Sequence, residues 1–307
     1  MTLLLGEVFY WLFNMSITST ITGIIVWLIG RIKAVPRRAA HILWVIPLIR
    51  MWVLIGIGSK YSLMSLLSKF ATRTVELYHV TYHFHFSTMN WIIAANSYFP
   101  ITYKLNILER IFNIASVIWI IFAVTGIIAF GIIYGIVKHE IRSATHFRDN
   151  VYISEKVTSP AVYGVFRPRI ILPEYMADSD LTLVLAHENA HIRRGDNLWR
   201  VIAFMTAIIH WFNPFAWLFL KNFLAETELA CDARVLAECG EEKRKAYALT
   251  LVNSAEQRSV FASAFGGARI RIRVDQILSY KKLSLASSIF FIALAISIAY
   301  VLLTNAL

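Results

Sequence analysis

The stretch His187-Glu188-Asn189-Ala190-His191 decides which fold and which chemistry we expect of this chain. Two histidines four positions apart lie on one face of an α-helix, so both imidazoles can bind a single cation. Glu188 then lies beside that cation without binding it, where it can accept a proton from water. The pentapeptide therefore predicts a zinc peptidase with His187 and His191 as metal ligands and Glu188 as the general base.

The residues around the pentapeptide predict that it is helical. The segment Asp178–Asp180 supplies side chains and negative charge that favour a helix start. Arg193 and Arg194 fall in the expected last turn, and Gly195 supplies a stop. An apolar stripe along the same helix consists of Leu181, Val184, Leu185 and Ile192.

A zinc ion held by two histidines and a water needs one more protein ligand. The next predicted helix begins at Asn213, which a proline follows, and stops at Gly240. Its acids Glu228 and Asp232 share a face, so one can bind the ion while the other orients a ligand imidazole. Glu226 lies about 200° around the helix from Glu228 and points away. We assign Glu228 as the third ligand and Asp232 as the supporting acid; the alternative is a solvated acidic patch.

The composition predicts a membrane protein. The 307 residues are 58% hydrophobic and only 16% charged, with a mean hydropathy of +0.60. We expect a mainly α-helical multi-pass protein with four transmembrane helices, each near the ~20 residues that a bilayer requires. An α+β zincin-like metalloprotease domain lies between the third and fourth helices. The four apolar stretches are Val8–Gly30, Ala40–Gly58, Ile111–Val137 and Leu285–Leu303.

Basic residues predict the orientation. Three clusters flank the apolar stretches and fall on one side if the N-terminus is outside. Residues 1–58 then contain two spans and a basic cytoplasmic loop, and residues 59–110 lie outside. Residues 111–137 form the third span, residues 138–284 are cytoplasmic, and residues 285–304 form the fourth span. No basic residue precedes the first apolar run, so a cleavable signal peptide is not expected. The clusters are Arg31, Lys33, Arg37 and Arg38; Lys138 and Arg142; Lys281 and Lys282.

A fifth apolar stretch, residues 198–224, is broken at Asn213 into halves too short to cross a bilayer. We expect a helical hairpin that lies in or dips into the inner leaflet. A single crossing would place Glu228 on the opposite side from His187, and the zinc site could not form.

Arg50, inside the second span, should face protein or water. One interpretation is that it helps to transmit a signal. The other is that it snorkels to the surface or pairs with an acid such as Glu109.

Several other features carry weaker signals. The net charge of +11 fits positive-inside loops and contact with anionic membrane lipids, and direct nucleic-acid binding is not expected. Tyr78–Phe86 alternates aromatic and polar residues; a strand or interfacial segment is favoured over a histidine metal site, because no carboxylate or cysteine accompanies it. Cys231 and Cys239 should be free thiols, and Cys231 is either a soft metal ligand or, more simply, a small buried side chain.

These residues together resemble the BlaR/MecR-type membrane metallopeptidases, the signal transducers of β-lactam resistance and their relatives. The resemblance covers about residues 1–304. The resemblance implies that His187, His191 and Glu228 hold zinc and that Glu188 is the base. It also implies a cytoplasmic zinc domain in the plasma membrane and an N-terminus outside. Asp196 and Asp232 are expected beside the ligands. The matching elements are His187–His191 followed by Asp196-Asn197, Trp211–Pro214, Glu228–Asp232, and Ser159–Pro173.

The chain also departs from the prototypes of that family. Their extracellular penicillin-binding sensor follows the last span, whereas here only Thr304–Leu307 remain, so we expect the sensor to be lacking. A single Ser-x-x-Lys, Ser279 to Lys282, has no companion motifs and is accidental. Self-cleavage before the last span is known in the family, and Ser263–Gly267 is a plausible flexible region for it. A homodimer is compatible with the sequence, although no heptad or small-residue seam requires it.

Three functions follow from these expectations. The first is a zinc metalloendopeptidase that cleaves a cytoplasmic regulator, by analogy a transcriptional repressor, or itself. Its substrate would pair as an extended strand with the edge formed by Arg169, Ile170, Ile171 and Leu172. The second is a quality-control protease like HtpX, which lacks the element Gly164–Pro173. The third is a noncatalytic receptor with a structural zinc site, against which Glu188 argues, since such a site needs no base.

Overall fold

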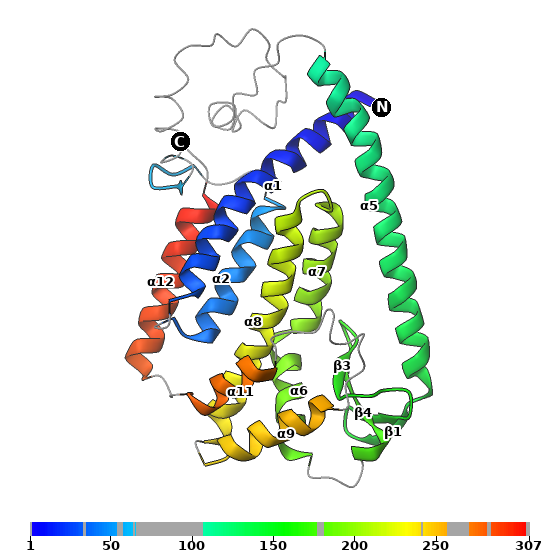
Figure 1. Cartoon of the computed structure of the whole chain (residues 1–307), viewed down its shortest axis with the longest axis vertical. Coiled ribbons are helices and arrows are strands. Elements are labelled where there is room, and N and C mark those ends of the chain that lie inside the picture. The colour runs from blue at the N-terminus through cyan, green and yellow to red at the C-terminus, as the bar shows by residue number, and fades with distance from the viewer. Residues whose placement is uncertain are drawn as a thin grey trace.

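Among the residues that the structure describes, three helices are long and apolar enough to cross a membrane, judged by length and composition. They are residues Val8–Gly30 within α1 (Thr2–Gly30), residues Ile111–Ser143 along α5 (Ile107–Glu140), and residues Ala286–Leu303 within α12 (Leu285–Leu303). The computed structural model describes residues 2–32, 35–53, 58–63, 65, 107–176, 181–240, 242–256, 270–280 and 284–304. Figure 1 shows α1, α2 and α12 side by side, with α5 along the far side of the bundle.

The predicted second span is shorter as a helix than its apolar stretch suggests. α2 (Arg37–Arg50) has 14 residues and ends in a turn at Met51 and Trp52. Fourteen residues rise about 21 Å, less than the ~30 Å of a bilayer core. Hydropathy counts apolar residues and does not register where a helix ends. The structure therefore supports three long spans, and the count of four stays a prediction.

The stretch 198–224 forms a helical hairpin, as expected, from α7 (Asp196–Ile209) and the first half of α8 (Pro214–Cys239). It enters the bundle beside α1 and α2 (Figure 1). Its two arms return to one level, since Arg200 of α7 pairs with Glu228 of α8 at 2.8 Å. The hairpin is thus re-entrant with respect to the helices around it, and its depth in a bilayer stays a prediction.

The tip of this hairpin is held by polar side chains. Asn213 Nδ2 donates to Ser16 Oγ at 2.7 Å and Thr20 Oγ1 at 3.0 Å, in the middle of α1. Trp119 of α5 donates its indole N–H to the carbonyl of Ile209 at 2.8 Å. A turn surrounded by apolar helices needs such partners, because lipid offers none. Ser16 and Thr20 of the first span therefore dock the hairpin, whereas Ser19 binds α2 by donating to the Pro47 carbonyl at 2.7 Å.

The largest apolar core lies between α2 and α8. Phe219 and Phe223 of α8 are 1% and 0% exposed and pack with residues of α1, α2, α7 and α12. Gly23 of α1 makes this packing feasible: a Cβ there would lie 2.0 Å from the Phe219 ring.

Arg50 of α2 is 1% exposed and donates to the carbonyl of Leu303 at 2.9 Å. It therefore faces protein, as expected, and binds the end of α12.

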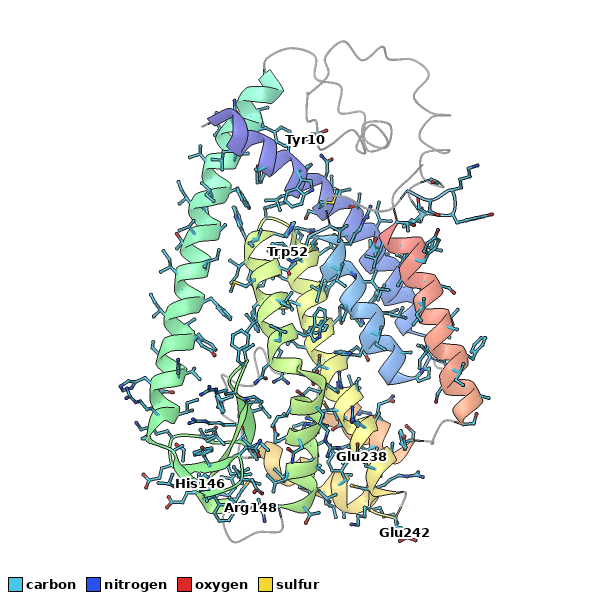
Figure 2. All side chains as sticks on the ribbon, turned by 180° about the vertical axis from the view of Figure 1, so that it is seen from behind. Tyr10, Trp52, His146, Arg148, Glu238 and Glu242 are labelled. Carbon is cyan, nitrogen blue, oxygen red and sulfur yellow. The ribbon has the colours of Figure 1, made fainter. Side chains whose placement is uncertain are left out.

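A small mixed domain follows α5 at one end of the bundle. Figure 2 shows the labelled residues His146, Arg148, Glu238 and Glu242 at this end, whereas Tyr10 and Trp52 lie along the helical body. The described residues contain four strands, which form a sheet in the order β1-β2-β4-β3; β2 and β4 are parallel, and the other pairs are antiparallel. Its elements are η2 (Ile141–Ser143), β1 (Thr145–Arg148), β2 (Val151–Ser154), β3 (Ala161–Tyr163), β4 (Arg169–Pro173), η3 (Glu174–Met176), α6 (Thr182–Arg194), α9 (Arg244–Glu256) and α11 (Ile270–Leu278).

The expectation that Arg169–Leu172 forms an exposed edge is wrong. These residues form β4, as predicted, but β4 lies between β2 and β3, so both of its sides are paired. Ile170, Ile171 and Leu172 are 0–1% exposed. A run of apolar residues is typical of a central strand, covered on both faces, and not of an edge. The free edge on this side of the sheet belongs to β3.

Candidate metal centre

Helix α6 carries the H-E-x-x-H pentapeptide. It ends at Gly195, whose φ of 65° gives the predicted left-handed stop. Its N-cap is Leu181, without a side-chain cap, and the predicted starting residues 178–180 lie outside the described part of the chain. The predicted apolar stripe packs on the sheet, in one cluster with Ile170 and Leu172 of β4. The remaining face of α6 carries His187 and His191.

The two histidines and Glu228 lie together. The Nε2 atoms of His187 and His191 are 3.2 Å apart, and the two carboxylate oxygens of Glu228 are each 3.5 Å from one of them. Two atoms bound to one tetrahedral zinc ion at about 2.05 Å lie about 3.3 Å apart. The three side chains therefore fit a single tetrahedral ion, and the two helices α6 and α8 supply them as the sequence predicted.

The other ring nitrogens are held by acids. His191 Nδ1 lies 2.7 Å from Asp196 Oδ2. Tyr247 donates its hydroxyl to Asp232 at 2.6 Å, and its oxygen lies 2.8 Å from His187 Nδ1. Because the Tyr247 proton is directed to Asp232, the hydroxyl oxygen accepts from His187 Nδ1. Both imidazoles thus direct an Nε2 lone pair at the same point, as in carboxylate–histidine–metal arrangements.

Cys231 belongs to a second group with His191 and Asp196, which has the residue types of a metal site. The 2.7 Å between His191 Nδ1 and Asp196 Oδ2 is a hydrogen-bond distance, too short for two ligands of one tetrahedral ion. Burial raises the pKa of the Cys231 thiol, so it stays protonated and donates to Asp196 at 3.2 Å. The thiol is a buried hydrogen-bond donor, and both cysteines are free, as expected.

Two arginines that the sequence did not reveal touch Glu228. Arg200 NH2 lies 2.8 Å from Oε1, and Arg273 NH1 lies 3.1 Å from Oε2. Burial would raise the pKa of Glu228, but His191 and Arg273 hold it well below its usual range. The third candidate ligand is therefore an ionised carboxylate, which is the form that binds a metal.

Glu188 is 7% exposed, and its helix α6 packs against strand β3. Burial and the charge of Glu188 together raise the pKa of Tyr163, the last residue of that strand. The N–H of Ile170 in β4 donates to the carbonyl of Asn150 at 3.0 Å, on the side of β4 that pairs with β2. Val162 of β3 is paired with Ile170. The N–H and C=O of Val162 therefore point away from β4, toward the free edge of the sheet. Asn197 donates to the carbonyl of Val162 at 3.0 Å, which leaves the Val162 N–H on that edge.

The site thus contains every predicted polar residue and none of the predicted strand residues. His187, His191 and Glu228 converge, and Glu188, Asp196 and Asp232 are their neighbours. Arg200, Tyr247 and Arg273 are additional members. One signal could have revealed Arg273: with Ile270, Val274 and Ile277 it occupies positions i, i+3, i+4 and i+7 of a helix, where an apolar residue is expected.

Long apolar helices and an H-E-x-x-H helix with a distant glutamate define the class of membrane metallopeptidases. The BlaR1 peptidase M56 family matches residues 10–275, and the chain belongs to this family. It is 30% identical over 159 residues to the regulatory protein BlaR1 of Bacillus licheniformis, covering 48% of this chain and 26% of the relative. It is 28% identical over 87 residues to the methicillin resistance mecR1 proteins of Staphylococcus aureus and Staphylococcus epidermidis, covering 27% of this chain and 15% of each.

Proposed function

We propose that the chain is a membrane-embedded zinc endopeptidase of the BlaR/MecR type that cleaves a cytoplasmic regulator during signal transduction. One observation carries the proposal. The Nε2 atoms of His187 and His191 and the carboxylate of Glu228 converge at 3.2–3.5 Å, with Glu188 on the same helix as the histidines. The chain spans about a quarter or less of the length of the curated relatives it matches, so its activity rests on this geometry.

His187, His191 and Glu228 would hold the zinc ion. When bound, zinc supplies Lewis acidity, which polarises a peptide carbonyl and makes water easier to deprotonate. Glu188 accepts the proton of the attacking water and delivers it to the leaving amine. Asp196 fixes His191, and Tyr247 with Asp232 fixes His187, so that both imidazoles keep their Nε2 atoms directed inward.

The substrate binds in this proposal along β3. An extended peptide would add to the free edge, with the Val162 N–H as a backbone donor to it. Asn197 restrains that edge because its amide donates to the carbonyls of both Val162 and Gly164, at 3.0 and 2.8 Å. This strand takes the role that the sequence had suggested for β4.

The substrate class follows from orientation and resemblance. The basic residues Arg31, Lys138 and Arg142 favour an N-terminus outside and a cytoplasmic protease domain in the plasma membrane. A cytoplasmic transcriptional repressor, and the chain itself, are the substrates that the resemblance to BlaR/MecR proteins supports. An HtpX-like quality-control protease is the second candidate, and its cleavage pattern would extend to many misfolded membrane proteins.

The test is a Glu188→Ala variant of the full chain in its native host. We expect this variant to bind about one zinc per chain, as the wild type does, and to lose cleavage by about 10²–10⁴-fold. Glu174→Ala, an exposed acid outside the site, serves as the control. Comparing cellular proteins between the two strains identifies the substrate. Unaltered cleavage or signalling in Glu188→Ala would instead support a noncatalytic receptor.

A further inference from the structure

Arg273 is buried to a degree that arginine rarely reaches. It is 1% exposed and projects from α11, whereas Arg271 on the same helix is exposed. The same buried face carries Ile277, which is 0% exposed and packs against Val235 and Leu236 of α8. A fully buried arginine is stable only when its charge is paired, so its partners decide what it does.

The guanidinium of Arg273 joins both acids of α8 to a histidine of α6. Nε and NH2 donate to the two oxygens of Asp232, both at 2.7 Å, which is a bidentate pair. NH1 lies 3.1 Å from Glu228 Oε2, and NH2 lies 3.4 Å from His187 Nε2. One side chain from a third helix therefore contacts two of the three candidate ligands and the acid beside them.

Charge explains why the site needs this side chain. Glu228 and Asp232 lie one turn apart on the same face of α8, and two buried carboxylates so close repel each other. The Arg273 guanidinium between them offsets the repulsion and binds both carboxylates. Without it, Glu228 would turn away from Asp232 and lose its position 3.5 Å from His187 Nε2.

Arg273 also reaches His187 through Asp232. The bidentate pair fixes the plane of the Asp232 carboxylate, whose Oδ1 accepts the Tyr247 hydroxyl at 2.6 Å and lies 3.3 Å from His187 Nδ1. The orientation of these acceptors decides which ring nitrogen of His187 carries the proton. Hence the guanidinium influences two candidate ligands by two separate routes.

We propose that Arg273 is a positioning residue that aligns Glu228 and His187 for metal binding, so that docking of α11 completes the metal centre. The proposal rests on the proposed function. Residues 279–284 join α11 to α12, the last long apolar helix, and α12 is bound at its other end by Arg50. The metal centre is thus tied through Arg273 to a helix of the membrane region.

The competing explanation is that Arg273 only anchors α11 to α8. The apolar contacts of Ile277 already bury that face of the helix, so the loss of an anchor would lower the stability of the fold and leave metal coordination as it was. Metal affinity and coordination geometry separate the two explanations, whereas proteolytic activity alone does not.

The experiment compares Arg273→Lys and Arg273→Gln with Arg271→Gln, in the full chain reconstituted in lipid nanodiscs. Zinc affinity is measured by competition with a chelator, and the visible spectrum of the Co²⁺-loaded protein reports ligand geometry. Lysine keeps the charge but cannot form the bidentate pair. We expect Arg273→Lys to bind zinc about 10–100-fold more weakly and to shift the Co²⁺ bands. Arg271→Gln should match the wild type in both measurements.

A second variant keeps the proposal falsifiable if the first does not fold. If Arg273→Gln fails to fold, the double variant Asp232→Asn/Arg273→Gln removes both buried charges; it should fold and still bind zinc more weakly than the wild type. Wild-type zinc affinity with an unchanged Co²⁺ spectrum in Arg273→Lys would overturn this proposal alone. Tighter zinc binding would also overturn it, since the guanidinium would then only compete with the metal. A wild-type chain that binds no zinc would overturn the proposed function as well.

Discussion

Two buried polar networks lie on the α7–α8 hairpin, one at its tip and one at its base, and they differ in charge. At the tip, Asn213 pairs with Ser16 and Thr20, and each of these groups is neutral. At the base, ionised acids and guanidinium groups surround two imidazoles whose Nε2 lone pairs converge with Glu228. At the tip, the polar groups hydrogen-bond to one another, and such a network holds helices together. At the base, several lone pairs point at one position, and this arrangement can bind a cation.

The largest effect should come from removing one imidazole from the base. His191→Ala should lower bound zinc from about one per chain to near zero and abolish cleavage, because two ligands do not hold the ion. His210→Ala removes an equally buried histidine, 0% exposed, at the tip. That variant should keep its zinc. Metal analysis of both purified proteins makes the comparison, and a full equivalent of zinc in His191→Ala would contradict the assignment.

Removing Asn213 tests the tip. Its side chain caps α8, accepting from the Phe215 N–H at 2.9 Å, and donates across the helices to α1. Asn213→Ala should lower the free energy of unfolding by about 2 kcal/mol, from a cap worth ~1 kcal/mol and interhelical bonds worth ~0.6 kcal/mol each. Denaturant titration in micelles measures it. Zinc affinity should not change, and a loss of zinc would show that the two networks are not independent.

The matched control for that variant is Asn222→Ala. Within the part of the chain that the structure describes, the Asn222 side chain hydrogen-bonds only to the Leu218 carbonyl of its own helix. Its removal should change the free energy of unfolding by less than about 0.5 kcal/mol. Equal losses in the two variants would mean that the interhelical contacts of Asn213 contribute nothing.

Lowering the pH should have a smaller effect on the free energy of unfolding, and this effect should differ between the two networks. Burial would raise the pKa of Asp232, but Arg273 holds it far below its usual range. A depressed folded-state pKa contributes stability that is present above the unfolded value, about 3.9, and is lost as the pH falls toward the folded value. The difference in unfolding free energy between wild type and Asp232→Asn should therefore shrink as the pH falls below about 4. The difference for Asn213→Ala should not vary with pH, and if both shrank together the base would not be the ionic network described.

The features that were predicted correctly from the sequence depend on local interactions along the chain. Gly195 and Gly240 end their helices and Asn213 begins one, because these positions depend on a single residue's backbone or side chain. The i, i+4 spacing places His187 and His191 on one face for the same reason. Arg200, Tyr247 and Arg273 reach the site from other helices, and only tertiary packing brings them there.

Non-local interactions explain the wrong expectation for β4 and the short helix found in the predicted second span. The pairing of β4 on both sides depends on where β3 returns, which no residue of β4 encodes. The length of α2 depends on the turn at Met51 and Trp52, which apolar composition does not register. The expectations for Tyr78–Phe86 and Ser263–Gly267 lie outside the described residues and stay predictions.

X-ray absorption at the zinc edge of the purified full chain tests the metal centre most directly. Coordination by His187, His191 and Glu228 predicts a shell of nitrogen and oxygen atoms only, at about 2.0–2.2 Å, with the outer-shell features of two imidazoles. A sulfur neighbour at about 2.3 Å would place the ion at Cys231 instead. That result, or a spectrum without imidazole, would contradict the account.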